Sequence, residues 1–170
     1  MKVIFLDFNG VLDTHDKMDE VDMDNLNRLK YIVDMTKAKV VISSSLKNSY
    51  YYTGKFSDKL KEVITLIVIN GIEVIGITPK ARSREEEIQK YLDEHPEIDN
   101  FVIIDDDYEM DMFKEHLVKL PSQMIEGQMG LDENGMNMAI NILNKNKINF
   151  KKVLVKKLPN LIIKSDIDYI

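Results

Sequence analysis

Residues 1–13 read MKVIFLDFNGVLD, and this stretch decides the fold that we expect for the chain. The apolar run over residues 3–6 is typical of a short strand buried on both faces. It ends at Asp7, just before a turn at Gly10. Asp7 therefore stands at the carboxyl end of a strand, the edge of an open α/β sheet where ligands bind. A carboxylate in that position serves to bind a hard cation or to attack phosphorus as a nucleophile.

Length and composition are those of one globular domain. The chain has 170 residues, of which 44% are hydrophobic and 31% are charged. Its net charge of −6 argues against a protein that coats nucleic acid by electrostatics. The absence of cysteine excludes disulfides, thiolate zinc sites and cysteine nucleophiles. We see no secretory signal, and the most apolar stretch, residues 63–69, is too short to span a bilayer, so we expect a soluble cytoplasmic protein without membrane contact.

The pattern along the chain alternates strands with helices. Apolar runs predict further strands over residues 39–42, 73–77, 101–104 and about 117–120. Helical spacing of apolar residues predicts helices around residues 26–33, 60–68, 84–92 and 133–143. Asp22 or Asp24 would cap the first of these helices, and Ser83 would cap the third in a capping box with Glu86. Residues 50–54, Tyr-Tyr-Tyr-Thr-Gly, read as an exposed aromatic loop. This order predicts a Rossmann-like, three-layer α/β/α sandwich with a mainly parallel sheet. We assign residues 1–144 to this domain and residues 145–170 to a C-terminal extension packed on it.

Three of the predicted strands end in polar residues, which are Asp7, Ser43 and the pair Asp105-Asp106. Parallel strands of one sheet end at the same edge, so these groups should converge there. Carboxylates that converge repel one another, and a divalent cation with a preference for oxygen ligands would relieve the repulsion. The sequence therefore predicts a Mg²⁺ site at this edge.

Read in order, these residues resemble the motifs of the haloacid-dehalogenase-like (HAD) phosphatases. The family usually has Asp-x-Asp-Gly-Val/Thr-Leu where this chain has Asp7-Phe-Asn-Gly-Val-Leu. Val-Val-Ile-Ser, ending at Ser43, resembles the second motif, and Ile-Ile-Asp-Asp, ending at Asp106, resembles the fourth. Ser-Ser-Ser (43–45) and Ile-Thr-Pro (77–79) are similar to the small capless HAD domain of multidomain RNA-repair proteins. The resemblance runs from residue 1 to about residue 143.

The resemblance implies a role for each residue type. Asp7 would be the nucleophile that becomes an aspartyl-phosphate, and the Ser43 hydroxyl would hold a phosphoryl oxygen. A cation near the start of the third helix would neutralise the phosphoryl charge; Arg84 is favoured, with Lys80 second. The residues expected to hold Mg²⁺ are Asp7, Asn9 (through its backbone carbonyl), Asp105 and Asp106. The residues expected to contact the substrate are Gly10 and Ser44.

Asn9 departs from the family pattern at the position of the general acid–base. The usual aspartate there protonates the leaving group and then activates water, whereas an asparagine exchanges no proton at neutral pH. The chain is thus an altered protein, an enzyme that recruits another group such as Asp13 or Asp16, or a phosphate-binding pseudoenzyme. We favour a magnesium-dependent phosphatase of phosphate monoesters whose activity Asn9 weakens or blocks; the alternative is an inactive phosphate-binding or sensor module.

The lengths of the insertions predict an open site. The segments after Leu12 and after Lys47 are too short for a large cap domain. An open site suits a small phosphorylated molecule, a nucleotide, a nucleic-acid end or a phosphoprotein. Response-regulator receiver domains gather similar groups, but there the acidic pair follows the first strand and the acceptor aspartate comes mid-chain. Here a single aspartate comes first and the pair comes late, which disfavours that fold.

Overall fold

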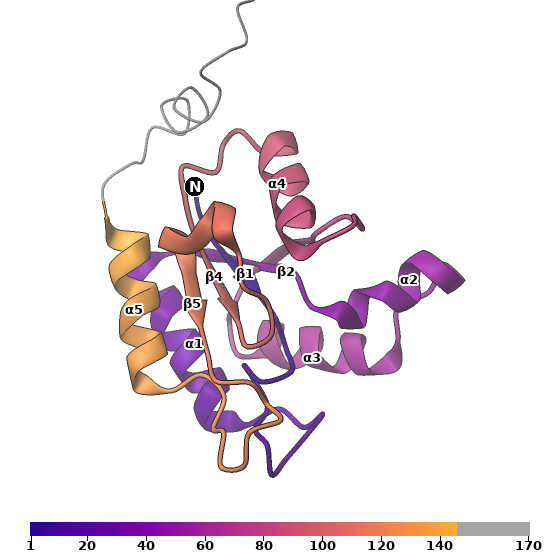
Figure 1. Ribbon diagram of the computed structural model, residues 1–170, viewed down its shortest axis with the longest axis vertical. Helices are drawn as coiled ribbons and strands as arrows, with labels where there is room; N and C mark the ends of the chain where they lie inside the picture. The colour runs from indigo at the N-terminus through magenta and orange to yellow at the C-terminus, as the bar shows by residue number, and fades with distance from the viewer. Residues whose placement is uncertain (146–170) are drawn as a thin grey trace, which may run out of the picture.

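The computed structural model describes residues 1–145, and within them five parallel strands form one sheet (Figure 1). The strands run in the spatial order β3-β2-β1-β4-β5. Their bounds are β1 Lys2–Leu6, β2 Lys39–Ile42, β3 Val74–Ile77, β4 Asn100–Asp105 and β5 Leu117–Lys119. The all-parallel sheet confirms the predicted α/β class. The predicted extension, residues 145–170, lies outside the described residues apart from Lys145.

Helical segments connect consecutive strands and cover both faces of the sheet. α1 (Met23–Thr36), α3 (Asp58–Ile69) and α5 (Glu133–Asn144) pack on one face. α4 (Arg84–Glu94) and the 3-10 segment η2 (Asp111–His116) pack on the other, which gives the three layers expected (Figure 1). The turn η1 (Ser45–Lys47) and the short helix α2 (Asn48–Thr53) lie between β2 and α3. No helix within residues 1–145 is long and apolar enough to cross a membrane.

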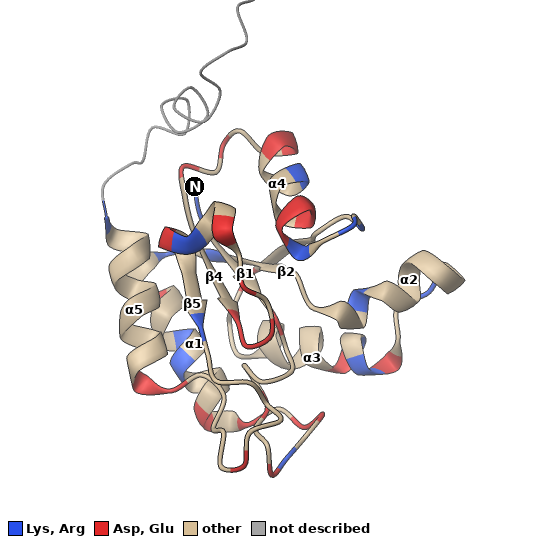
Figure 2. Cartoon of the chain, in the orientation of Figure 1, with Lys and Arg blue, Asp and Glu red and all other residues tan. Residues whose placement is uncertain are grey.

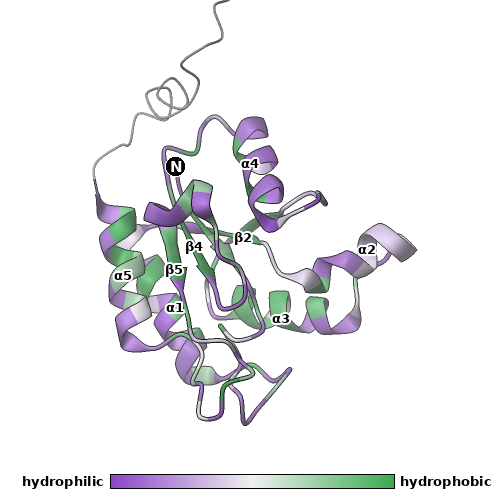
Figure 3. Cartoon of the chain, viewed as in Figure 1, coloured by the Kyte–Doolittle hydropathy of each residue, from purple (hydrophilic) through white to green (hydrophobic). Residues whose placement is uncertain are grey.

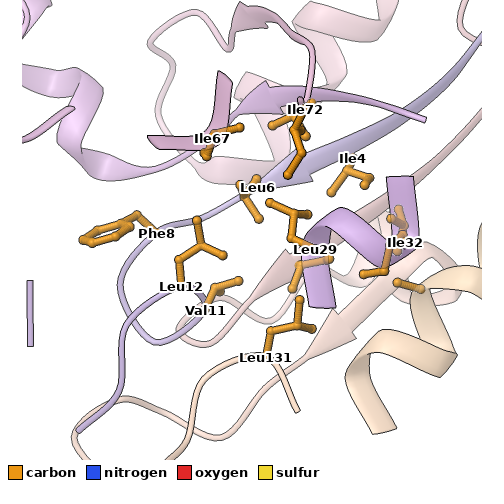
Figure 4. Packing of buried hydrophobic residues seen from close by; sticks show 14 of the residues in the cluster. Ile4, Leu6, Phe8, Val11, Leu12, Leu29, Ile32, Ile67, Ile72 and Leu131 are labelled. Atoms are coloured by element: carbon orange, nitrogen blue, oxygen red, sulfur yellow. The ribbon is translucent and has the colours of Figure 1, made fainter. Parts of the chain in front are cut away.

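Alternation along β1 explains why the sheet has a core on each face. Side chains of successive strand residues point to opposite faces. Ile4 and Leu6 join the core under α1, α3 and α5, where Leu29, Ile32 and Ile67 meet them (Figure 4). Val3 and Phe5 join the core under α4 and η2. All four side chains are buried, and the strands form the hydrophobic centre of the molecule (Figure 3).

The predicted caps start two of the helices. Asp22, rather than Asp24, caps α1, and its carboxylate accepts hydrogen bonds from the backbone N–H of Asp24 and Asn25. Ser83 caps α4 by accepting from the N–H of Glu86 at 3.2 Å. The capping box is not reciprocal, because the Glu86 carboxylate accepts from the N–H of Arg82 instead of that of Ser83. Each cap satisfies donors that the first helical turn leaves unpaired.

The tyrosine segment is helical, so the prediction of a loop over residues 50–54 was wrong. α2 runs through all three tyrosines and ends at Thr53; the next residue, Gly54, caps it with φ +70° and donates its N–H to the Tyr50 carbonyl. Nothing in this segment breaks a helix before that glycine. The Tyr50 ring stacks on Phe56 at 4.6 Å between centroids, which fixes the short helix against the following turn. The tyrosines remain exposed, as predicted, with Tyr52 the most exposed at 76%.

Candidate active site

The register of the sheet brings the predicted site residues to one edge. Leu6 of β1 is level with Ile42 of β2 and with Ile104 of β4. The residues that follow these positions are Asp7, Ser43 and Asp105. Backbone hydrogen bonds continue past the strands, from the N–H of Asp7 to the Ile104 carbonyl (3.1 Å) and from that of Ser43 to the Leu6 carbonyl (2.9 Å). The three side chains therefore start from a rigid, hydrogen-bonded edge.

Asp7, Asp105 and Asp106 form a compact carboxylate cluster. Each offers one oxygen, and these oxygens lie within 4.8 Å of one another, all on buried residues. Burial, followed by the charge of Asp7, raises the pKa of Asp105 to about 6. Burial also raises the pKa of Asp106. The cluster thus holds more negative charge than it can stabilise alone.

One oxygen of this cluster has no hydrogen bond in the described part of the chain. Asp105 Oδ2 is buried and accepts no hydrogen bond from any group within residues 1–145. A buried carboxylate oxygen without a hydrogen bond is costly, and a bound cation satisfies it. Three carboxylates with a free oxygen are the ligands that hard divalent cations prefer, so the residues fit Mg²⁺. Those that could hold the ion are Asp7, Asp105 and Asp106.

Arg84 supplies the positive charge beside these carboxylates. The first turn of α4 delivers its side chain to the sheet edge, where it is almost fully buried. Its guanidinium nitrogens lie 3.5 Å from Asp7 Oδ2 and 3.7 Å from Asp105 Oδ2, and it donates a hydrogen bond to the Ser43 carbonyl. The centroid of the Tyr108 ring lies 4.9 Å from the guanidinium carbon of Arg84. Arg84 therefore spans the ends of three strands.

Lys80, the second candidate for this cation, points elsewhere. Its ammonium donates a hydrogen bond to the Tyr52 hydroxyl and lies 3.8 Å from the centroid of that ring. The loop before α4 is basic at its tip (Figure 2), and within residues 1–145 neither Lys80 nor Arg82 forms an ion pair with the carboxylates. The structure thus brings Arg84 to Asp7, whereas Lys80 contacts Tyr52 of α2.

The two neighbouring serines have different surroundings. Ser43 Oγ is buried and has no hydrogen-bond partner within residues 1–145. Ser44 Oγ accepts from the N–H of Leu46 at 3.4 Å and caps the η1 turn. A buried hydroxyl without a partner at the site is available to a ligand. Ser43 fits the predicted contact with a phosphoryl oxygen, whereas the Ser44 hydroxyl already has a structural partner.

Gly10 allows the loop after β1 to pass close to the carboxylates. It has φ +68, and a Cβ built there would lie 2.1 Å from Asp106 Oδ2. Its carbonyl accepts a hydrogen bond from Gln128 at 2.7 Å, which ties this loop to the loop after β5. Only glycine combines this conformation with so close an approach.

Asn9 is held by acidic neighbours rather than by the carboxylate cluster. Its side-chain amide donates to Asp13 Oδ2 (3.1 Å) and to Asp19 Oδ1 (3.0 Å). Asp13 is fully buried and also accepts from the N–H groups of Gly10 and Asp19. Burial raises the pKa of Asp13. Asp13 therefore organises the loop with both oxygens engaged, while Asp16, the other proposed substitute, is exposed.

Lys47 and Glu87 support the site but were missed from the sequence. The buried Lys47 ammonium lies 2.8 Å from Glu87 Oε2 and donates to the carbonyls of Ser43 (3.0 Å) and Ser44 (3.3 Å). Glu87 also lies 3.8 Å from Arg84 Nε, one turn earlier on α4. This i,i+3 pairing of Arg84 with Glu87 was the available signal. The pair of Lys47 and Glu87 holds the loop after β2 and the Arg84 side chain in place beside the strand ends.

Comparisons with known proteins agree with this geometry. Residues 3–134 match the family model described as "HAD domain in Swiss Army Knife RNA repair proteins". No curated protein and no solved structure matches the chain. The match spans more than half of the chain and includes all the strand ends that form the carboxylate cluster. The chain therefore belongs to the family of HAD domains found in Swiss Army Knife RNA repair proteins.

Proposed function

We propose that the chain is a magnesium-dependent, phosphatase-like hydrolase that acts on a phosphate monoester through an aspartyl-phosphate at Asp7. The observation that carries the proposal is the position of the Asp7 carboxylate. It lies at the end of the central strand, 3.5 Å from Arg84 and within 4.8 Å of the oxygens of Asp105 and Asp106. A carboxylate fixed next to a cation and a candidate metal site is placed to act as a nucleophile toward phosphorus.

Each residue has a chemical task in this proposal. An Asp7 oxygen forms the bond to phosphorus while the bond to the leaving oxygen breaks, and water later releases phosphate and restores the carboxylate. Arg84 neutralises the phosphoryl oxygens, and the unpartnered Ser43 hydroxyl donates a hydrogen bond to one of them. When bound, Mg²⁺ would reduce the repulsion between the phosphoryl group and the carboxylates.

Asn9 sets the rate in this proposal. Its amide cannot protonate the leaving oxygen or activate water, and such acid–base catalysis is worth roughly 10²–10⁴-fold. Asp13 offers no simple replacement, because three N–H groups already donate to its two oxygens. We therefore expect turnover only of esters with good leaving groups, followed by slow hydrolysis of the intermediate.

The substrate is a phosphate monoester reached through an open site. A small molecule, a nucleotide, a nucleic-acid end and a phosphoprotein remain candidates. The matched family takes its description from RNA repair proteins, which favours a nucleic-acid end among them. The net charge of −6 implies that such a substrate is bound at the site and not along the general surface.

The test compares hydrolysis of p-nitrophenyl phosphate by the chain as given and by its Asn9→Asp variant, with Mg²⁺ and with EDTA. Asp7→Asn in both backgrounds is the matched control. We expect magnesium-dependent turnover that is at least ~10²-fold faster in the Asn9→Asp variant and abolished by Asp7→Asn. Absence of turnover in both proteins, with Mg²⁺ bound, would refute the enzymatic proposal.

A second candidate, an inactive phosphate-binding module, is favoured by one observation. The Asn9 amide donates to two acidic side chains, so the loop is built around an amide rather than a carboxylate at this position. A protein with this role would bind phosphate esters in the presence of Mg²⁺ without consuming them. Any turnover by the chain as given would exclude it.

A further inference from the structure

A small cavity lies beside the candidate active site, at the start of α4. Its volume is about 170 Å³. It is lined on one side by the loop after β3 and the first turn of α4, and on the other by η1 and the start of α2. The side chains that matter for its chemistry are Lys80, Arg82, Arg84 and Tyr108. Figure 2 shows the basic tip of the loop that precedes α4.

The cavity carries positive charge that the surrounding protein does not neutralise. Lys47 and Glu87 line it as well, but they pair with each other at 2.8 Å. Within residues 1–145, neither Lys80 nor Arg82 forms an ion pair. The Lys80 ammonium contacts the neutral ring and hydroxyl of Tyr52. Two unpaired cations that line one cavity are suited to an anionic group.

Arg84 connects the cavity to Asp7. The same guanidinium lines the cavity and lies 3.5 Å from the Asp7 carboxylate. An anion in the cavity would therefore be separated by one arginine side chain from a phosphoryl group at Asp7. Two anionic groups of a single small ligand can span that separation.

Aromatic rings accompany the cations. Tyr52 lies beside Lys80 and is 76% exposed, and Tyr108 lies beside Arg84 and is 40% exposed. Exposed rings interleaved with basic side chains are typical of surfaces that bind nucleotides, because bases stack on the rings while the cations hold phosphates.

We propose that this cavity is a subsite for a second phosphate, held by Lys80 and Arg82, on a nucleotide whose terminal phosphate monoester lies at Asp7. The inference rests on the proposed function, since it takes Asp7 as the site of the first phosphate. The substrate class is then a nucleoside bisphosphate unit, either free or as the last nucleotide of an oligonucleotide. Lys80 and Arg82 select for the second phosphate.

Calorimetric titration of the full chain in Mg²⁺ tests the subsite without requiring turnover. The probes are uridine 3′-monophosphate and uridine 3′,5′-bisphosphate, and the quantity measured is the ratio of their dissociation constants. We expect the bisphosphate to bind at least ~10-fold more tightly. Lys80→Gln/Arg82→Gln should bring the ratio close to one. Lys37→Gln/Lys90→Gln removes the same charge from exposed positions elsewhere and should keep it.

The outcomes separate the subsite from the proposed function. A ratio near one in the unaltered chain, or an equal fall in the Lys37→Gln/Lys90→Gln control, overturns the subsite. A ratio of at least ~10 that depends on Lys80 and Arg82, together with no turnover of p-nitrophenyl phosphate by the chain as given or by its Asn9→Asp variant, supports the subsite and refutes the enzymatic proposal alone. If neither probe binds, the subsite is overturned, whereas the proposed function is decided separately by the p-nitrophenyl phosphate assay.

A third probe identifies the source of the second phosphate. A dinucleotide with a 3′-terminal phosphate presents a phosphodiester where the bisphosphate presents a monoester. Equal affinity for the two assigns the cavity to a nucleic-acid end, and clear preference for the bisphosphate assigns it to a free nucleotide. Both results support the subsite, provided that Lys80→Gln/Arg82→Gln removes the gain in affinity over uridine 3′-monophosphate.

Discussion

Replacing Lys47 with methionine tests how Arg84 is held in place at the candidate active site. Methionine keeps the apolar stem of the lysine but removes an ammonium that is 2.8 Å from Glu87 and that donates to the carbonyls of Ser43 and Ser44. Glu87 would then remain buried with one ion-pair partner, Arg84, at 3.8 Å. We expect Arg84 to move toward Glu87 and away from Asp7.

The size of the effect follows from burial. Removing one partner of a buried ion pair costs about 3–5 kcal/mol, because the remaining charge is left without compensation. Here Arg84 and the N–H of Ala81, 3.5 Å from the Glu87 carboxylate, offer partial compensation. We therefore expect Lys47→Met to lower the free energy of unfolding by about 3 kcal/mol. The double variant Lys47→Met/Glu87→Gln removes both charges, so its free energy of unfolding should fall by less than that of Lys47→Met.

Urea unfolding followed by circular dichroism measures these losses. The matched control is Lys39→Met, which removes an ammonium from Glu73 at 2.7 Å in a largely exposed pair and should cost less than about 1 kcal/mol. If Lys47→Met costs no more than Lys39→Met, or if adding Glu87→Gln makes the loss larger, the buried pair does not support the site as argued.

Three further predictions concern the loops around the carboxylates. Gly10→Ala should lower the free energy of unfolding by about 2–3 kcal/mol, because its Cβ meets Asp106 at 2.1 Å and φ is positive. Asp105 has a pKa of about 6 in the folded state and an ordinary, lower pKa in the unfolded state, so the folded state binds its proton more tightly. The free energy of unfolding of the metal-free protein should therefore rise by up to ~3 kcal/mol as pH falls from about 7 to 4. Asn9→Asp should cost about 1–3 kcal/mol at neutral pH, since a donor to Asp13 becomes a third nearby carboxylate, and the loss should shrink in acid.

Each of these has a matched control in chemical denaturation. Gly54→Ala has the same backbone strain but open space around the added methyl group. Asp105→Asn should flatten the pH profile, whereas the exposed Asp107→Asn should leave it unchanged. Asn27→Asp places the same charge on the exposed side of α1. Equal losses of stability in Gly10→Ala and Gly54→Ala, or in Asn9→Asp and Asn27→Asp, would contradict the argument for Gly10 or for Asn9. Identical pH profiles for Asp105→Asn and Asp107→Asn would contradict the argument for Asp105.

Much of the fold could be predicted because local patterns and tertiary structure agree. The apolar runs that end in Asp7, Ser43 and Asp105 are central strands, and parallel pairing alone brings those residues together. Helix starts were readable at Asp22 and Ser83, because capping depends on only a few neighbouring residues. The choice of Arg84 over Lys80 rested on the resemblance, because the HAD family often places this cation near the start of a helix, and the structure places Arg84 at Asp7.

The rest could not be read because it depends on partners far along the chain. Lys47 looks like an ordinary surface lysine until α4 brings Glu87 over it. The direction of the Asn9 amide depends on the path of a loop that carries no periodic pattern. The tyrosine segment was taken for a loop because its helix is too short to show helical spacing, and its contact with Phe56 depends on the following turn.

The central position of β1 has a consequence for how ligands affect the whole molecule. Asp7 directly follows this strand, and the other residues of the site come from the ends of β2 on one side and β4 on the other, two segments far apart in the chain. No part of the chain smaller than the sheet can assemble the site. Opening of the sheet therefore destroys the site, so a ligand that binds there only in the folded protein stabilises the entire domain, by RT ln(1 + [L]/Kd). A rise in melting temperature that a candidate ligand causes in the unaltered chain, and not in an Asp7→Asn variant, would then report binding at this strand end.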